Sequence, residues 1–361
     1  MPGYAHGRES LRQVSALEPF VIRTCEGPSG TRPRVRGYEP KPGQPFAPFE
    51  IYDPFGLRNA IIPVFCQQVD GRMYGVGTAF HVDGFGNFLT AYHVIDFVEK
   101  HLSGRPILFL SMHAVVFGTI NIPPDCFVPA DEVIASMMES DDPMAALRGQ
   151  ASRRPAIDVA LLKPEPIGPC ARPPQTLPIR INGWAPRIGE IVLAVGFPQL
   201  DLSEVDIAKQ SSLLAEGMYG AYGRIVAIHE AGVSRSNPTP VFEVESDWPG
   251  GMSGGPVFNR DGEVVGMVSR SLRAESEHAG IGYAVHFSLA RDIELLTPNV
   301  DRFNPGWRKC WGVFASMTPE PISMHATKEQ AEAAASRLEG PADVRPIANR
   351  IGTTDFVDLS V

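Results

Sequence analysis

The chain has 361 residues, which is enough for one large domain or two small ones. Its formal net charge is −9, and the charged residues are scattered without a basic stripe, so the composition disfavours nucleic-acid binding and the acidity needs no explanation beyond solubility. The 35 glycines and 34 prolines favour many turns and short strands over long helices.

Cysteine usage and the lack of long apolar segments bear on the cellular location. The 5 cysteines are odd in number, widely spaced and without a CxxC pair, unlike the dense set of a secreted disulfide scaffold. They are Cys25, Cys66, Cys126, Cys170 and Cys310. The first residues carry no apolar core of a signal peptide, and no stretch is long enough to span a membrane. These features predict a reducing cytoplasmic location without membrane attachment, although export by another route stays open.

Residues 1–48 are rich in proline, glycine and charge. This composition predicts a loosely ordered leader, of which a few segments can dock on the body of the protein.

From about residue 59 the pattern changes to short apolar strands separated by glycine-rich turns. The strands expected in this first set are 60–65, 75–82, 88–91, 106–110, 114–117 and 158–162. Residues 131–138 contain helix formers behind an acidic start, and they predict one helical insertion.

A run of prolines between residues 163 and 178 marks a linker. A second set of strands follows it, at 190–195, 223–228, 241–244, 256–258, 264–268 and 282–285. Many short strands on each side of one linker predict two antiparallel barrels, whose closure removes exposed strand edges. Barrel one is expected over about 59–163 and barrel two over about 179–290.

The tail, residues 299–361, has a different pattern. A strand is expected at 311–315, followed by a helix that begins at Thr327 with Gln330 as its capping partner. Gly340 and a proline end this helix, and 344–347 returns as a strand. The fold class predicted from the whole sequence is therefore all-β, with a small C-terminal α+β appendage.

A serine between glycines is the sharpest chemical signal in the sequence. Ser253 lies in the segment Asp247-Trp248-Pro249-Gly250-Gly251-Met252-Ser253-Gly254-Gly255-Pro256, where it has little steric cover. Glycines let the backbone turn so that amides point at one spot. The amides of Gly251 and Ser253 could then hold an oxyanion, each contributing about 3 to 4 kcal/mol. The alternative is a glycine-rich turn that only links two strands.

Two further residues are candidate catalytic partners of this serine. His93 stands at the end of a short strand, and a serine hydroxyl needs such a base because it is a poor nucleophile at neutral pH. Asp158 stands just before an apolar strand, where a carboxylate is expensive to bury without a partner. Taken alone, the histidine could be an ordinary surface or core residue and the aspartate could face solvent. Together, the three follow the chain order His, Asp, Ser found in chymotrypsin, and they lie at the cleft between the barrels.

The chain resembles the trypsin-like peptidases, and specifically their bacterial HtrA-like branch. The resemblance spans about residues 60–290, within an expected peptidase domain of 49–298. The segments that carry it are 75–80, 89–95, 157–162, 194–198, 251–256 and 280–285. It implies a double six-stranded barrel, protein or peptide substrates, hydrolysis of peptide bonds through an acyl-enzyme, and no metal or organic cofactor.

The resemblance also implies roles for single residues. Ser253 would attack the carbonyl, His93 would take its proton and return it to the leaving amine, and Asp158 would fix the tautomer of His93. Gly251 and Ser253 would donate the oxyanion amides.

Substrate-binding residues follow from the same resemblance. Ser269, Arg270 and Ser271 match the strand that pairs with the substrate backbone, and the Ser269 hydroxyl is expected to reach Asp158. Asp247 lies six residues before Ser253, where trypsins place the carboxylate that binds Lys or Arg. HtrA-like relatives usually prefer small apolar residues instead, so both specificities stay open.

The sequence departs from the pattern in two places. Residue 252 is methionine where digestive trypsins have the aspartate that receives a freed N-terminus, so activation by that ion pair is not expected. No recognisable PDZ module follows the barrels.

Two other readings stay open. One is a barrel that binds proteins without turnover, and the other is a protease regulated by a partner protein that docks on residues 299–361. The remaining histidines show no metal-binding spacing, so no metal site is expected.

Overall fold

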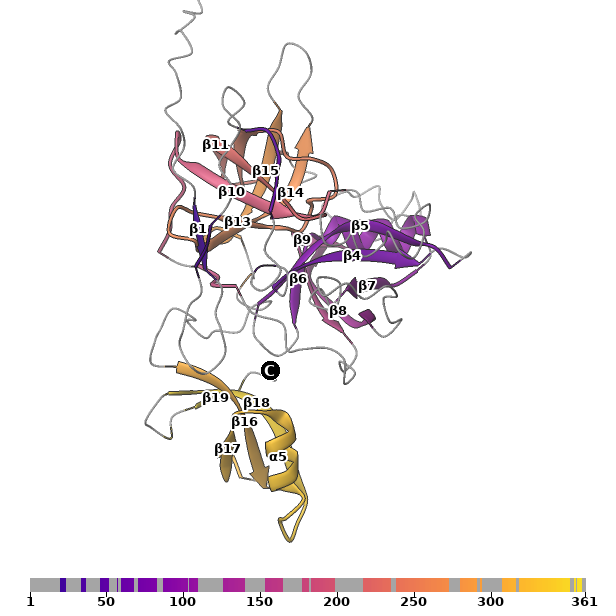
Figure 1. Ribbon diagram of the computed structural model, residues 1–361, viewed down its shortest axis with the longest axis vertical. Helices are drawn as coiled ribbons and strands as arrows, with labels where there is room; N and C mark the ends of the chain where they lie inside the picture. The colour runs from indigo at the N-terminus through magenta and orange to yellow at the C-terminus, as the bar shows by residue number, and fades with distance from the viewer. Residues whose placement is uncertain are drawn as a thin grey trace, which may run out of the picture.

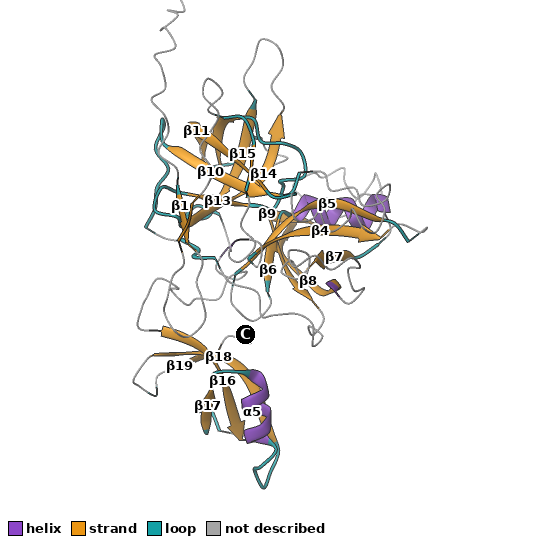
Figure 2. Ribbon diagram, viewed as in Figure 1, coloured by secondary structure: helices purple, strands orange, loops and turns teal. Residues whose placement is uncertain are grey.

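The computed structural model of the protein describes residues 20–23, 34–36, 46–51, 57, 60–67, 71–82, 87–102, 104–109, 126–139, 153–164, 177–181, 183–198, 217–234, 238–272, 280–290, 293, 307–315, 318–350, 354 and 356–358. Over these residues the fold consists mainly of antiparallel strands with few helices (Figure 1, Figure 2). Within the same ranges, no helix is both long and apolar enough to cross a membrane.

The first half of the chain forms a closed barrel with the strand order β4-β5-β6-β9-β8-β7. Its strands are β4 (Ile61–Gln67), β5 (Met73–His81), β6 (Phe88–Thr90), β7 (Pro106–Phe109), β8 (Phe127–Glu139) and β9 (Arg153–Pro164). The interior is packed with apolar side chains, among them Ile62, Val64, Ala79, Phe88, Leu108 and Leu162. A short helix α1 (Tyr92–Phe97), continued by the π-helical turn η2 (Val98–Leu102), follows β6 directly.

The second half forms another barrel, in the order β10-β13-β14-β15-β12-β11, which closes where β10 pairs with β11. Its strands are β10 (Ile191–Gly196), β11 (Tyr219–His229), β12 (Val241–Ser246), β13 (Pro256–Phe258), β14 (Val264–Leu272) and β15 (Ile281–His286). Its interior is filled by residues such as Val192, Ala221, Phe242, Val244, Trp248 and Met252. The two closed antiparallel barrels confirm the double six-stranded architecture expected from the sequence.

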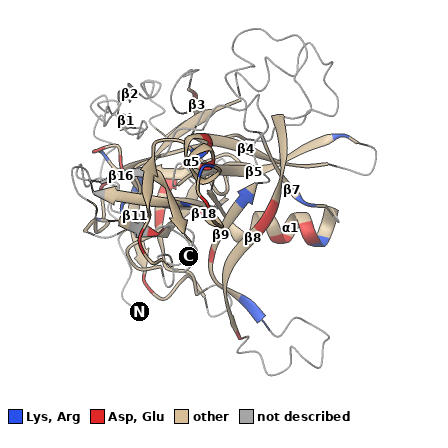
Figure 3. Ribbon diagram, turned by 90° about the horizontal axis from the view of Figure 1, so that it is seen from below, with Lys and Arg blue, Asp and Glu red and all other residues tan. Residues whose placement is uncertain are grey.

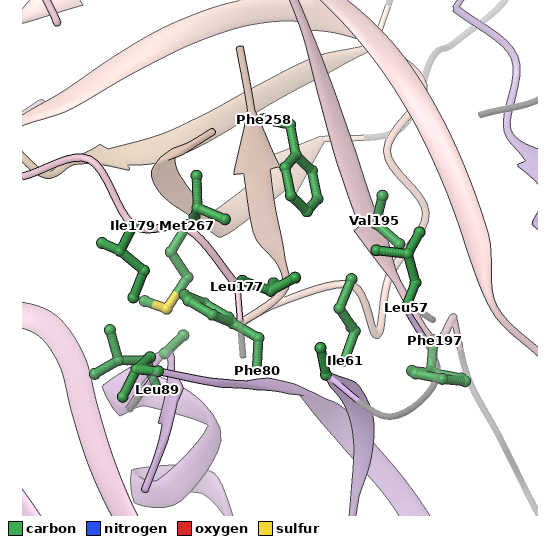
Figure 4. Packing of buried hydrophobic residues seen from close by; sticks show 14 of the residues in the cluster. Leu57, Ile61, Phe80, Leu89, Leu177, Ile179, Val195, Phe197, Phe258 and Met267 are labelled. Carbon is green, nitrogen blue, oxygen red and sulfur yellow. The ribbon is translucent and has the colours of Figure 1, made fainter. Parts of the chain in front are cut away.

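One hydrophobic cluster joins the two barrels (Figure 4). It combines Phe80 and Leu89 from barrel one with Phe258 and Met267 from barrel two, and all four are buried. Leu177, from the connecting segment, lies among them. Fully burying a side chain of this size contributes about 1.5–3 kcal/mol. The barrels are therefore held by a shared core, and groups at their junction can keep fixed positions.

Parts of the predicted leader dock on barrel two. Strand β1 (Val21–Arg23) pairs with β2 (Arg34–Arg36). Just after the leader, β3 (Phe49–Glu50) adds to the edge of β11. Phe20 contacts the Tyr222 ring edge-on, and its N–H donates to the Tyr222 hydroxyl over 3.2 Å. Apart from residues 20–23, 34–36 and 46–48, the leader lies outside the described residues, as do the predicted strand 114–117 and most of the linker.

The helix predicted for residues 131–138 is wrong, because this segment belongs to strand β8. Val133 and Ala135 point into the barrel with a period of two, and the strand pairs with β9 along most of its length. Helix propensity is a weak prior that such pairing overrides.

Residues 307–358 form a separate four-stranded sheet with one helix, which confirms the α+β appendage. The sheet order is β17 (Ser323–His325), β16 (Trp307–Ala315), β18 (Ala342–Arg350) and β19 (Phe356–Asp358). Helix α5 (Lys328–Ala335) begins as expected, because Thr327 Oγ1 accepts a hydrogen bond from the Gln330 N–H over 3.3 Å. Strands β17 and β19 were not expected from the sequence.

Charged residues are spread over the fold. Figure 3 shows Lys and Arg interspersed with Asp and Glu, and no basic stripe runs along any described element.

Candidate active site

His93 and Asp158 lie in direct contact in barrel one. His93 is in the first turn of α1, and Asp158 is on β9, which pairs with the strand β6 that leads into α1. His93 Nδ1 lies 2.9 Å from Asp158 Oδ2 and 3.1 Å from Oδ1, and the His93 backbone N–H donates to Oδ1 over 2.9 Å. Since a carboxylate only accepts hydrogen bonds, Nδ1 carries the proton and Nε2 is left for another partner.

The environment keeps Asp158 ionised. Its side chain is only 10% exposed, whereas that of His93 is 37% exposed. Burial alone would raise the pKa of Asp158, but the charge of His93 and the hydrogen bonds from His93 and Ser269 outweigh it and hold the pKa below its ordinary value. The pair therefore combines a buried charged carboxylate with a half-exposed imidazole.

An irregularity in the sheet frees Asp158 for these contacts. The register between β8 and β9 jumps from Ala135 opposite Ala160 to Met137 opposite Pro155, so residues 156–159 of β9 are left out of this ladder. The Asp158 N–H donates instead to Thr239 Oγ1, over 3.0 Å. Thr239 belongs to barrel two, so both barrels hold this aspartate.

Ser253 lies in the turn between β12 and β13 of barrel two. The turn uses positive φ at Gly251 (93°) and Gly254 (84°). A Cβ on Gly254 would lie 2.1 Å from the Thr78 carbonyl oxygen, so only glycine fits there. The Ser253 carbonyl accepts a 2.8 Å hydrogen bond from the Thr78 N–H, which ties this turn to barrel one.

Ser269 connects the serine with the aspartate. It stands at a β-bulge in β14, between Val268 opposite Ala284 and Arg270 opposite Tyr283, and bulges of this kind re-aim a side chain. Its hydroxyl donates to Asp158 Oδ2 over 2.5 Å, and its carbonyl accepts from Ser253 Oγ over 3.3 Å. Within the described residues, Ser253 Oγ makes no hydrogen bond with His93, so the three predicted residues are linked through Ser269.

Two backbone amides of the turn donate to no acceptor among the described residues. The carbonyl of Met252 is held by the Gly255 N–H over 2.8 Å, and the carbonyl of Gly251 by Thr78 Oγ1 over 3.1 Å. Because a trans peptide points its N–H away from its C=O, the Ser253 N–H faces the opposite side. Neither the Gly251 N–H nor the Ser253 N–H donates to an acceptor in the described part of the chain.

The predicted specificity residue Asp247 follows β12 directly. A Cβ on Gly280 would lie 3.0 Å from Asp247 Oδ1, so this side chain lies against the Gly280 backbone. Its carboxylate forms no ion pair or hydrogen bond with the residues that the structure describes. The next residue, Trp248, turns into barrel two, where its Nε1 donates to the Ala221 carbonyl over 3.2 Å.

The remaining predicted site residues continue β14. Arg270 is exposed and Ser271 half-buried, and neither contacts His93, Asp158 or Ser253 in the hydrogen bonds described. Among the described residues, no group of three or more His, Cys, Asp or Glu side chains is arranged to hold a metal ion. Sequence reasoning missed Thr78 and Thr239, since a single threonine carries no motif that would reveal a contact across the two barrels.

Comparisons with known proteins assign the chain to a family. A family model described as a trypsin-like peptidase domain matches residues 77–267, which is more than half of the chain. In Pseudomonas fulva (strain 12-X), a "Probable periplasmic serine endoprotease DegP-like" is 30% identical over 178 residues, covering 49% of this chain and 32% of the relative. The protein of the same name in Hahella chejuensis (strain KCTC 2396) is 26% identical over 180 residues, covering 49% and 33%.

Among solved structures, the inactive form of the Rv3671c protease, from M. tuberculosis H37Rv, matches with 16% identity and a TM-score of 0.38. The match covers 66% of this chain and 89% of that one. The chain spans about a third of the length of the curated relatives it matches.

The predicted cytoplasmic location is wrong. The relatives are named as periplasmic endoproteases, which conflicts with it. The cysteine argument failed for a physical reason. The described cysteines Cys66, Cys126 and Cys310 are buried and form no disulfide, and buried thiols with no second thiol at bonding distance say nothing about the redox compartment.

Proposed function

Because the chain belongs to the trypsin-like peptidase family, we propose that it is a serine endopeptidase that cleaves protein or peptide substrates through an acyl-enzyme. The observation that carries this proposal is the hydrogen-bond network that links Ser253, Ser269, Asp158 and His93. The names of the relatives support the same reaction class.

In the proposed reaction, Ser253 Oγ attacks the carbonyl carbon of the scissile peptide bond and its proton passes to His93 Nε2. His93 then gives this proton to the nitrogen of the leaving amine as the C–N bond breaks. Water attacks the resulting ester with His93 again as the base, which releases the acid product and restores the Ser253 hydroxyl. Asp158 holds the Nδ1–H and stabilises the imidazolium that forms.

The Ser253 hydroxyl must change its acceptor before it can react. It donates to the Ser269 carbonyl over 3.3 Å, a long hydrogen bond that is easily given up. We propose that a substrate strand pairs with residues 269–271, so that a substrate N–H takes over the Ser269 carbonyl. The hydroxyl can then turn to His93 Nε2.

The oxyanion of the tetrahedral intermediate would be held by the N–H groups of Gly251 and Ser253. The support is that both amides lie in the turn that carries the nucleophile and donate to no acceptor in the described residues. A preorganised donor of this kind contributes about 3 to 4 kcal/mol to transition-state stabilisation.

Primary specificity has two candidate explanations. If Asp247 receives the side chain before the scissile bond, substrates with Arg or Lys there are cleaved fastest, and Asp247→Ser removes that preference. If the site instead takes small apolar residues, Ala and Arg substrates are cleaved at comparable rates and the variant changes little. A matched pair of peptides that differ only at this residue decides between them.

The experiment that tests the proposed function is labelling with a fluorophosphonate probe, followed by mass spectrometry. We expect one adduct on Ser253 in the wild-type protein and none in Ser253→Ala or His93→Ala. Ser336→Ala is the matched control, because the Ser336 hydroxyl bonds the Ala333 carbonyl in the C-terminal unit, away from the network. A folded wild-type protein without an adduct would contradict the proposal and favour a binding barrel without turnover.

Two broader features belong to the same proposal. We propose a periplasmic location, supported by the names of the relatives and tested by cell fractionation. That a regulatory protein docks on residues 299–361 stays a prediction of the sequence. Equal activity and equal partner capture by the chain with and without residues 300–361 would contradict it.

A further inference from the structure

Thr78 is a buried residue of barrel one that touches the Ser253 turn of barrel two. It lies on β5, is 0% exposed, and is surrounded by groups from both barrels. Its side chain takes no part in the hydrogen-bond network that links Ser253, Ser269, Asp158 and His93.

The Thr78 hydroxyl bridges two backbone groups of barrel two. Oγ1 donates to the Gly251 carbonyl over 3.1 Å and accepts from the Phe197 N–H over 2.9 Å. The backbone of Thr78 is also engaged, because its N–H donates to the Ser253 carbonyl over 2.8 Å and its carbonyl accepts from Thr90 Oγ1 over 2.8 Å. Every polar group of Thr78 is thus hydrogen-bonded, and three of its four bonds reach barrel two.

The Gly251 carbonyl belongs to the peptide between Gly251 and Met252. This peptide is flanked by the one that carries the Gly251 N–H and the one that carries the Ser253 N–H. Its own N–H makes only a long contact, 3.4 Å from Met252 N to the Pro249 carbonyl. Thr78 Oγ1 therefore provides the shorter of the two anchors on the central peptide.

Gly251 makes such an anchor necessary. At φ 93° it occupies a region that glycine enters at no steric cost, and glycine can leave it as easily. Without an acceptor bond to fix the carbonyl, the central peptide can rotate and carry the neighbouring N–H groups out of alignment. The peptides on the C-terminal side of the central peptide are already fixed. The Met252 carbonyl accepts from the Gly255 N–H, and the Ser253 carbonyl accepts from the Thr78 N–H.

We propose that the Thr78 hydroxyl is a positioning element that sets the two oxyanion donors of Ser253 and Gly251 from the opposite barrel. This inference rests on the proposed peptidase function, because it gives that function its oxyanion geometry. A threonine or serine is required at residue 78, since the hydroxyl must donate and accept at the same time.

The kinetic test compares Thr78→Val, which keeps the shape and removes the hydroxyl, with Thr78→Ser, which keeps the hydroxyl. We expect Thr78→Val to lower kcat about 10- to 100-fold with KM changed less than about 3-fold, since loss of one oxyanion donor costs about 10²–10³ in kcat. The affinity for a peptide aldehyde, whose adduct places an oxygen at the same donors, falls by a similar factor. Thr78→Ser restores both quantities. Thr318→Val is the matched control, because it removes a threonine hydroxyl bonded to the Ala315 carbonyl in the C-terminal unit.

A second readout does not depend on turnover. In protein labelled with ¹⁵N at glycine and serine, we expect the amide resonances of Gly251 and Ser253 to shift in Thr78→Val and to return in Thr78→Ser. Unchanged resonances and unchanged kcat in Thr78→Val would overturn the inference, and so would a Thr78→Ser variant as impaired as Thr78→Val. Wild-type protein without activity, but with these shifts, would overturn the proposed peptidase function and leave the anchoring role of Thr78 supported.

Discussion

Replacing Thr239 by valine tests how barrel two holds Asp158. Thr239 is 3% exposed and precedes β12, and its Oγ1 accepts the Asp158 N–H over 3.0 Å. Valine has nearly the same shape but no acceptor. The Asp158 N–H lies in the segment of β9 without a ladder partner, so in this variant it stays buried and unpaired.

The size of the effect follows from that lost bond. A buried donor without an acceptor costs about 1–3 kcal/mol, which we expect as a loss in the free energy of unfolding. The carboxylate keeps its contacts with His93 and Ser269, so the site is loosened and not dismantled. We expect kcat/KM to fall about 10-fold, which corresponds to about 1.4 kcal/mol of transition-state stabilisation.

The assay combines urea unfolding with steady-state hydrolysis of one chromogenic peptide. Thr239→Ser keeps the acceptor and should recover most of both quantities. A valine variant within about 0.5 kcal/mol of the wild type and equally active would refute the reasoning. A serine variant as impaired as valine would show that the methyl group, and not the hydrogen bond, matters at this position.

Two further predictions concern the turn and the pH dependence of stability. Gly254→Ala should lower the free energy of unfolding by about 2–5 kcal/mol and abolish turnover, because a Cβ would lie 2.1 Å from the Thr78 carbonyl oxygen at φ 84°. Gly340→Ala is the control in the same urea titration, and it should be neutral because a Cβ there would meet nothing within 4 Å. Burial lowers the pKa of His286 from 6.5 to about 4. The neutral ring therefore contributes to the free energy of unfolding, by about 3 kcal/mol at most, and this contribution is fully present above pH 6.5. It is lost as the pH falls from 6.5 towards 4. Unfolding curves at several pH values should show this slope in the wild type and a shallower one in His286→Phe; equal slopes would contradict it.

The features that the sequence predicted well are those with a local signature. Short apolar runs between glycine turns identified the barrel strands other than β8, and Thr327 with Gln330 identified the start of α5. His93, Asp158 and Ser253 stood out because each type is chemically distinctive and their chain order is informative. The structure links them in one network, and their catalytic roles stay a proposal.

The features that the sequence did not predict depend on pairing at a distance. Residues 131–138 have a helical composition, but β9 offers them a ladder, and closure of the barrel decides their conformation. The contacts of Thr78 with Gly251, and of Thr239 with Asp158, join residues 173 and 81 positions apart. No local pattern encodes such contacts, because they exist only once both barrels have formed.

The polar contacts across the junction and the shared hydrophobic core have different tasks. Apolar burial of residues such as Phe80 and Met267 supplies free energy but little orientation, because hydrophobic attraction is not directional. Hydrogen bonds add little net stability and much geometry. Among the described residues, Thr239 and Ser269 are the only barrel-two residues that hydrogen-bond Asp158. In the other direction, Thr78 of barrel one anchors the Ser253 turn. The site therefore acquires its geometry when the barrels dock. A substitution at the junction can consequently impair catalysis while both barrels stay folded.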